Sequence, residues 1–224
     1  RDRLRSRGLG DVYKRQNLYA VATFGNVSSA PLEMPLKDGS STSLAVTNNW
    51  GEDYLLVKFN KDGEILWATS IGSKFRENGT PDVTVGEDGN PVICGVFNAA
   101  NGNLTNESEE KREFYIGEQK YLLYPEQSKE SALVKLNSTD GSVMWSRYFT
   151  GTGNQEVLKV QAVSGSNAVA VTGKANNQII VEGSAGLSTE TVTHVSGADH
   201  LFVISFDVDG KLLWSKSASG DTSS

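Results

Sequence analysis

The chain has 224 residues, a length that suits one large all-β domain or a piece of a larger one. It carries 21 basic and 27 acidic residues, a net charge of −6, and no basic stripe outside its first residues, which argues against nucleic-acid binding. Its single cysteine, Cys94, excludes an internal disulfide and a cysteine-based zinc site, and no stretch reaches the ~18 apolar residues that a spanning helix needs.

The first sixteen residues, RDRLRSRGLGDVYKRQ, differ in character from the rest of the chain. They resemble translated sequencing-adapter sequence, above all in the DVYKRQ end, and we interpret residues 1–16 as a non-native arm. The alternative is a genuine basic arm. If the arm is non-native, the true N-terminus is missing, and the absence of a signal peptide says nothing about localisation.

From Asn17 onward, short β-branched and aromatic runs alternate with Gly, Asn, Asp and Ser, which predicts strands and turns. No window shows the 3.6-residue apolar period of a substantial helix. In the best-defined unit the predicted strands cover about 53–59, 64–71, 82–87 and 91–97, joined by turns at Asp62-Gly63 and at residues 86–90. Further hairpins of variable length are predicted at 32–46, 113–124 and 179–195.

Three sequence markers recur along the chain and identify an internal repeat. The first is Asp-Gly followed by three residues and Trp: Asp62-Gly63 with Trp67, Asp140-Gly141 with Trp145, and Asp209-Gly210 with Trp214. The second is the apolar strand before each turn: YLLVKFN, SALVKLN and HLFVISFD. The third is an Asn that opens an apolar strand: Asn17, Asn90 and Asn167. The tryptophans are 78 and 69 residues apart and the asparagines 73 and 77, so independent markers agree on one period.

Each marker has a physical role in a β-sheet unit. Asp-Gly makes a tight hairpin turn, because Gly accepts a positive φ and Asp tolerates it. Strands that are apolar on both faces, such as 200–207, are expected to be covered on both sides. A large ring at a fixed place in every unit predicts packing between neighbouring sheets. The alternative for these rings is a stacking platform for a sugar or another ring.

We therefore predict an all-β fold, a β-propeller fragment of about three repeated antiparallel blades. The predicted divisions are a partial blade at 17–50, a unit at 51–130, a unit at 131–198 and a partial unit at 199–224. Closed propellers hold about 4–8 blades, so the remaining blades are expected to lie outside this sequence. A piece of this kind is expected to leave unpaired sheet edges.

The strings ALVKLNSTDGSVMWSRYFTG and GEDGNPVICGVF resemble the bacterial SBBP-type β-propeller repeat, over about 17–220. The resemblance implies an extracellular or cell-surface bacterial protein whose propeller is a binding or spacer module without an assigned reaction. The third copy departs from it, with Ser205 in place of Lys58 and Lys135. Gly-x3-Trp also looks like the docking motif of quinoprotein propellers, although a quinone dehydrogenase needs calcium ligands and, in many members, a vicinal Cys pair.

Few residues suggest chemistry. His194 and His200, with Asp199 between them, could join a metal site, but strand-end histidines are the simpler interpretation. Asp207 and Asp209 imitate the start of a calcium loop, and a hairpin turn explains them equally well. The position of Cys94 inside an apolar strand favours core packing over a nucleophile. We predict no catalytic, cofactor-binding or metal-binding residue.

The favoured function is a non-catalytic binding or spacer module of an exported or cell-surface protein. Its inter-strand loops would contact an unknown protein or glycan, with no nucleic acid and no membrane span in this fragment. The alternative is part of a propeller enzyme, quinoprotein-like or a hydrolase or lyase, whose active site lies in the missing blades. Fold alone does not separate the two, because propellers host many functions.

Overall fold

The structure is a computed structural model. It describes residues 17–25, 31–44, 52–73, 79–98, 113–117, 119–122, 129–151, 153–184, 186–192 and 200–219. Throughout these residues the secondary structure is strand and turn, with no helix, so the prediction of an all-β fold is confirmed. It follows that no described helix is long and apolar enough to cross a membrane. The predicted arm at 1–16, His194 and Asp199 lie outside the described residues.

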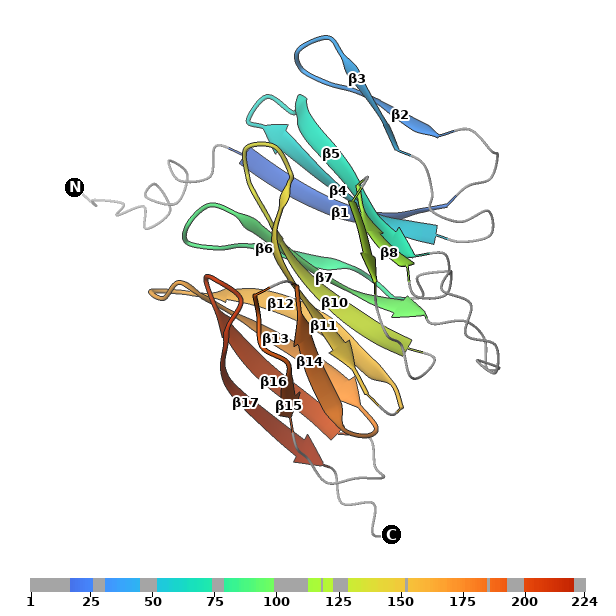
Figure 1. Ribbon diagram of the computed structural model, residues 1–224. Coiled ribbons are helices and arrows are strands. Elements are labelled where there is room, and N and C mark those ends of the chain that lie inside the picture. Colours follow the sequence, from blue (N-terminus) through green and yellow to red (C-terminus); the bar gives the residue numbers. More distant parts are fainter. Residues whose placement is uncertain are drawn as a thin grey trace, which may run out of the picture.

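Three antiparallel sheets follow one another from the blue to the red end of the chain (Figure 1). The first sheet has the order β1 (Asn17–Gly25), β4 (Glu52–Asn60), β5 (Ile65–Ser73), β8 (Glu113–Ile116), β9 (Gln119–Leu122). The middle sheet has the order β15 (Glu190–Val192), β14 (Ile179–Gly183), β11 (Val143–Thr150), β10 (Lys129–Leu136), β7 (Pro91–Asn98), β6 (Asp82–Val85). The last sheet has the order β12 (Gln155–Val163), β13 (Ala168–Ala175), β16 (His200–Asp207), β17 (Leu212–Ser219). None of the sheets closes on itself.

Two hairpins pair with the sheet before the one whose strands flank them in sequence, and we call these the exchanged hairpins. The β8–β9 hairpin lies in sequence between β7 and β10 of the middle sheet, yet β8 pairs with β5 of the first sheet, where Ile116 faces Ile71. Likewise β14 lies between β13 and β16 of the last sheet, yet it pairs with β11 of the middle sheet, where Val181 faces Phe149. A third hairpin, β2 (Leu32–Pro35) and β3 (Ser41–Leu44), holds the same place in sequence between β1 and β4, and forms a two-stranded sheet of its own.

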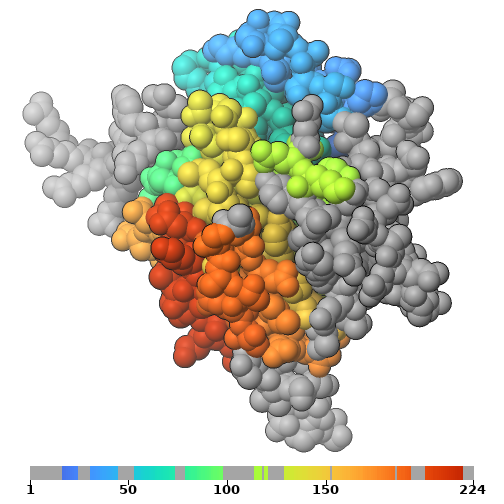
Figure 2. Space-filling view, in the orientation of Figure 1, coloured from blue at the N-terminus to red at the C-terminus, as the bar shows by residue number. Residues whose placement is uncertain are grey.

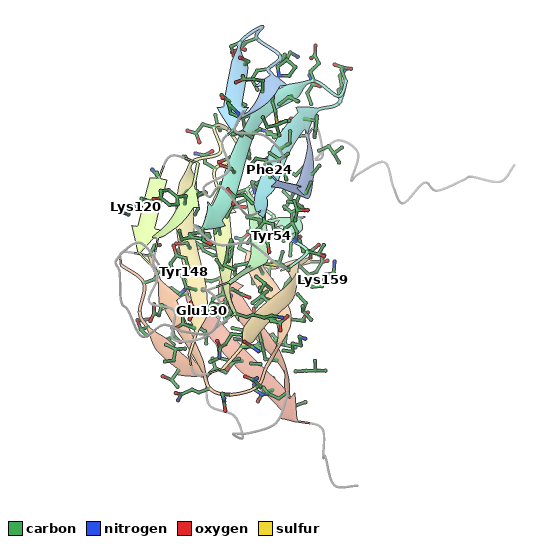
Figure 3. The ribbon with its side chains drawn as sticks, turned by 90° about the vertical axis from the view of Figure 1, so that its right-hand side faces the viewer. Phe24, Tyr54, Lys120, Glu130, Tyr148 and Lys159 are labelled. Atoms are coloured by element: carbon green, nitrogen blue, oxygen red, sulfur yellow. The ribbon has the colours of Figure 1, made fainter. Side chains whose placement is uncertain are left out.

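Two apolar clusters fill the spaces between the sheets. One lies between the first and middle sheets and includes Tyr54 and Tyr148 (Figure 3). The other lies between the middle and last sheets and includes Phe149 and Phe202, whose rings stack at 6.2 Å. Because side chains alternate along a strand, adjacent residues of β10 enter different clusters. The middle sheet is therefore covered on both faces, as its doubly apolar strands predict.

The predicted Asp-Gly turns form as tight hairpins. The glycines have φ values of +80° at Gly63, +75° at Gly141 and +80° at Gly210, a region that residues with a Cβ rarely adopt. The strands on either side run close to the predicted bounds, with β4 at Glu52–Asn60 and β5 at Ile65–Ser73. The first sheet combines β1, from the predicted partial blade at 17–50, with strands from the predicted unit at 51–130, and the middle sheet combines β6 and β7 from that unit with strands from 131–198.

Candidate functional site

The repeated tryptophan and turn meet across the space between sheets. Trp67 on β5 donates its indole N–H to the carbonyl oxygen of Ser138, at 3.0 Å, in the β10–β11 turn of the middle sheet. Lys58 lies opposite Trp67 on β4, and its ammonium donates to that same carbonyl. Two donors of the first sheet therefore converge on one backbone oxygen of the next sheet. We call the ring and its hydrogen bond to the turn the Trp–turn contact.

The same contact recurs one sheet further along. Trp145 on β11 donates to the carbonyl of Val208 at 2.8 Å, in the β16–β17 turn of the last sheet. Lys135, opposite Trp145 on β10, donates to Val208 at 2.9 Å. Trp67 is 8% exposed and Trp145 6%, so both rings are buried between sheets. This geometry favours the packing interpretation of the two rings over a ligand-stacking platform.

The glycines of these two turns also leave space for the indole ring of the neighbouring sheet. A Cβ on Gly141 would lie 3.1 Å from the ring of Trp67, and one on Gly210 would lie 2.8 Å from the ring of Trp145. Each ring therefore lies directly over a glycine, where a side chain would push it away. The Asp-Gly pair thus supplies both the positive φ and the space for the neighbouring indole.

Buried charges support the second Trp–turn contact. The Lys135 side chain is 3% exposed and pairs with Asp88 of the β6–β7 turn at 2.6 Å. Burial of the Asp88 carboxyl opposes its ionisation, but hydrogen bonds from Lys135 and Asn90 outweigh it and hold the pKa below the usual value. Burial alone lowers the pKa of Lys58, the equivalent lysine in the first contact.

Arg147 extends the second contact towards the exchanged hairpin. Its guanidinium is buried and donates from Nε to the carbonyl of Gly210 and from Nη1 to that of Ser188, both at 2.6 Å. Burial lowers its pKa, while Glu190 on β15 acts in the opposite sense. One cation therefore ties the turn of the last sheet to the hairpin that completes the middle sheet.

The third copy differs from the expectation that all three rings pack between sheets. Trp214 on β17 is 46% exposed, whereas Trp67 and Trp145 are 8% and 6% exposed. Its partner across the strand pair is Ser205, where the first two copies have a lysine. The reason is positional: each ring docks on the following sheet, and no described sheet follows the last one.

The three marker asparagines lie in different surroundings and make different contacts. Asn90 accepts a hydrogen bond from the Ser138 N–H at 2.9 Å and so steadies the turn that receives Trp67. Asn17 lies opposite Asn60 at the start of β1, and Asn167 lies in the exposed β12–β13 turn. The recurring Asn therefore marks the start of a strand rather than one shared contact.

The residues considered for chemistry lie in structural positions. His200 is buried at the start of β16, and Asp207 accepts the backbone N–H groups of Asp209 and Lys211 within its own turn. Cys94 is buried, and burial raises the pKa of its thiol to about 12. Within the described ranges, no three His, Cys, Asp or Glu side chains group as they would around a metal.

Sequence reasoning missed the side chains that join the first strands of adjacent sheets. On β6, Asp82 accepts the N–H of Val160 at 3.0 Å, and Thr84 accepts that of Ala162 at 3.0 Å. In the turn after β6, Glu87 accepts the N–H of Gly165 at 2.6 Å. The first two bonds satisfy backbone groups along the open edge of β12, and the third satisfies one in the turn that follows it. The alternation of Asp82 and Thr84 with Val83 and Val85 was the available signal for the first two bonds.

No protein-family model matches the chain, and a search of curated proteins finds no match. The described geometry can hold successive sheets together in one direction, because the middle sheet presents Trp145 to the last sheet and receives Trp67 of the first sheet at its own turn. A small hollow beside the second contact is lined by Asp88, Lys135, Trp145, Asn167 and Val208.

Proposed function

We propose that the chain is part of a β-propeller array and acts as a non-catalytic binding or spacer module of an exported or cell-surface bacterial protein. The observation that carries the proposal is the Trp–turn contact, formed twice in the same way by Trp67 and Trp145. A contact that joins like units in series is typical of repeat scaffolds, whose stability comes from each unit and its nearest neighbours. The resemblance to SBBP-type repeats supports the bacterial, extracellular setting.

The propeller arrangement is supported by the two edges of the sheets. At one edge, β6 and β12 approach closely enough for side chains of one to bond backbone of the other. At the opposite edge the first and middle sheets are extended by the exchanged hairpins, β8–β9 and β14–β15. Propeller blades likewise crowd together at their inner strands and widen outward. An experimental structure tests this: β1, β6 and β12 should line one axis, and a straight stack of sheets would refute the propeller.

Two measurements test the function. In fractionated cells that express the full-length gene, we expect the protein in the envelope or the medium, and a cytoplasmic pool would contradict export. For the module itself, labelled protein is presented to arrays of surface polysaccharides and extracellular proteins, and any retained ligand is recovered and analysed. A ligand recovered unchanged supports a binding module, no ligand across the arrays favours a spacer, and chemical conversion of a ligand refutes the non-catalytic proposal.

A further inference from the structure

Two side chains lie beside the places where the exchanged hairpins dock. Thr69 on β5 and Arg147 on β11 each stand two residues after a docked tryptophan, Trp67 or Trp145, and therefore share its face of the sheet. β5 and β11 are also the strands that receive the β8–β9 and β14–β15 hairpins. Thr69 is 8% exposed and Arg147 is 0% exposed, so both side chains are enclosed.

The two hairpins dock in the same register. Ile71 faces Ile116 in the first sheet and Phe149 faces Val181 in the middle sheet, in each case two residues beyond the enclosed side chain. Both hairpins reach the surface on the face drawn in Figure 2, where β8–β9 is lime green and β14–β15 is orange. The hairpins differ in the segments that connect their two strands, residues 117–118 in one and residues 182–189 in the other.

The short connection turns directly beside Thr69. Gly117 has a φ of +56°, and its N–H donates to the carbonyl of Ser70 at 2.8 Å. A Cβ on Gly117 would lie 3.1 Å from the Thr69 hydroxyl oxygen. A longer side chain at position 69 would therefore press on this turn and displace it.

The long connection passes around the Arg147 guanidinium instead. Arg147 lies opposite Gly183, where a Cβ would come within 3.0 Å of Nη1. Nη1 donates to the carbonyl of Ser188 at 2.6 Å, and Nη2 lies 3.9 Å from the Glu190 carboxylate. This segment supplies both the space and an acceptor for a large cation, and a buried cation without such partners is costly.

We propose that the side chain two residues after each docked tryptophan selects the hairpin that its sheet accepts from the following unit. The short side chain of Thr69 fits the tight connection at 117–118, and Arg147 requires the long connection at 182–189. Neighbouring units are therefore not interchangeable, because a sheet accepts only a hairpin whose connection matches its own side chain. The proposal goes beyond the function proposed above, because it holds whatever the chain binds.

Backbone amide hydrogen exchange on the full chain tests the two positions separately. Arg147→Thr should accelerate exchange in β14 and β15 roughly 30-fold or more, because the Ser188 and Gly210 carbonyls lose a charged donor. Thr69→Arg should accelerate exchange in β8 and β9 comparably, because the longer side chain displaces the Gly117 turn. Each substitution should leave the other hairpin at its wild-type rate. Thr69→Ser is the matched control and should exchange like the wild type.

Exchanging the connections decides between selection and a merely structural role. Thr69→Arg is combined with residues 182–189 in place of 117–118, and Arg147→Thr with residues 117–118 in place of 182–189. Each matched combination should bring exchange in its hairpin to within about threefold of the wild type, whereas either connection beside the wrong side chain should stay fast.

Three results overturn the proposal. The first is a single substitution that leaves the exchange rate of its hairpin unchanged. The second is a connection that loosens the hairpin equally beside either side chain, which would show that the two changes act independently. The third concerns a substitution that prevents folding on its own: circular dichroism should then show strand structure recovered in the matched combination, and a matched combination that also stays unfolded refutes selection.

Discussion

At the residue scale, one backbone carbonyl in each turn that lies under a tryptophan accepts hydrogen bonds from two side chains of the neighbouring sheet. The Val208 carbonyl accepts from both Trp145 and Lys135, and Asp88 balances the lysine charge at 2.6 Å. A buried charge is tolerated only when it is paired and hydrogen-bonded, and these partners meet that condition. The tryptophan supplies buried apolar area, while the lysine fixes which carbonyl lies beneath it.

The burial of the rings predicts unequal costs for removing them. Trp67→Ala and Trp145→Ala should each lower the free energy of unfolding by ~3–5 kcal/mol, because each empties a packed site between sheets. Trp214→Ala should cost less than about 1 kcal/mol, since its ring is half-exposed. Chemical denaturation measures all three. Equal losses at Trp145 and Trp214 would contradict the assigned roles.

The Lys135–Asp88 pair predicts a pH dependence. The folded-state pKa of Asp88 lies below the ordinary value of 3.8, so its contribution to stability is fully present above that value and is lost as the pH falls through the folded pKa. Asp88→Asn should therefore flatten part of the acid limb when the free energy of unfolding is measured from pH 7 to pH 3. Asp140→Asn is the comparison, because this exposed turn carboxylate also has a lowered pKa, but hydrogen bonds from Ser142 lower it. Parallel acid limbs for Asp88→Asn and the wild type would refute the role of the pair.

Sequence reasoning identified much at this scale and failed at identifiable places. The positive φ of Gly63, Gly141 and Gly210 follows from Asp-Gly alone, because the turn is a local structure. The exposure of Trp214 does not follow from its own neighbours in sequence, since what covers such a ring is a turn about seventy residues further along, as Ser138 is for Trp67. The role of Arg147 was hidden for the same reason.

At the element scale, the exchanged hairpins determine how the units join. The segment 113–124 was predicted to be a hairpin from its own residues, and β8 and β9 form there. Its acceptor, β5, could not be predicted, because pairing between strands far apart depends on edges that no local pattern specifies. The sequence therefore revealed the period of the repeat but not the overlap between successive sheets.

The exchange predicts that the donor hairpin stabilises the sheet before its own. Ile116→Ala on β8 should lower the free energy of unfolding by ~2–5 kcal/mol, because that side chain is 3% exposed and lies in the cluster between the first and middle sheets. Leu32→Ala on β2 is the matched control, since that leucine is 39% exposed, and its cost should stay within about 0.5 kcal/mol. Similar costs for the two substitutions would show that β8 does not complete the first sheet.

At the scale of the whole molecule, the middle sheet has an apolar cluster on each face, and the outer sheets each contribute to one of these two clusters on the face towards it. Apart from Lys129, every residue of β10 is buried, whereas most described residues of β17 are exposed. The doubly apolar pattern of these strands was legible in the sequence. The unequal burial of the three copies could not be predicted from the sequence, because the repeated pattern is nearly the same in all of them.

This layering predicts a gradient of local opening. Backbone amide hydrogen exchange, followed by mass spectrometry, should be slowest in β7 and β10 and faster in β1 and β17, because opening free energy rises with buried contacts. Uniform protection along the chain would contradict this. In the Trp145→Ala variant, hydrogen exchange should become faster, and the increase should be largest in the last sheet and in β11.

The direction of the Trp–turn contact also bears on how the protein is made. The carbonyl that receives Lys58 and Trp67 belongs to a residue 80 and 71 positions nearer the C-terminus. On the ribosome, therefore, the earlier sheet emerges with its indole uncovered and its outer strand unpaired, and it is finished only when the next stretch of polypeptide leaves the exit tunnel. Each newly translated segment completes the sheet before it, so the nascent chain always includes one sheet that is not yet complete.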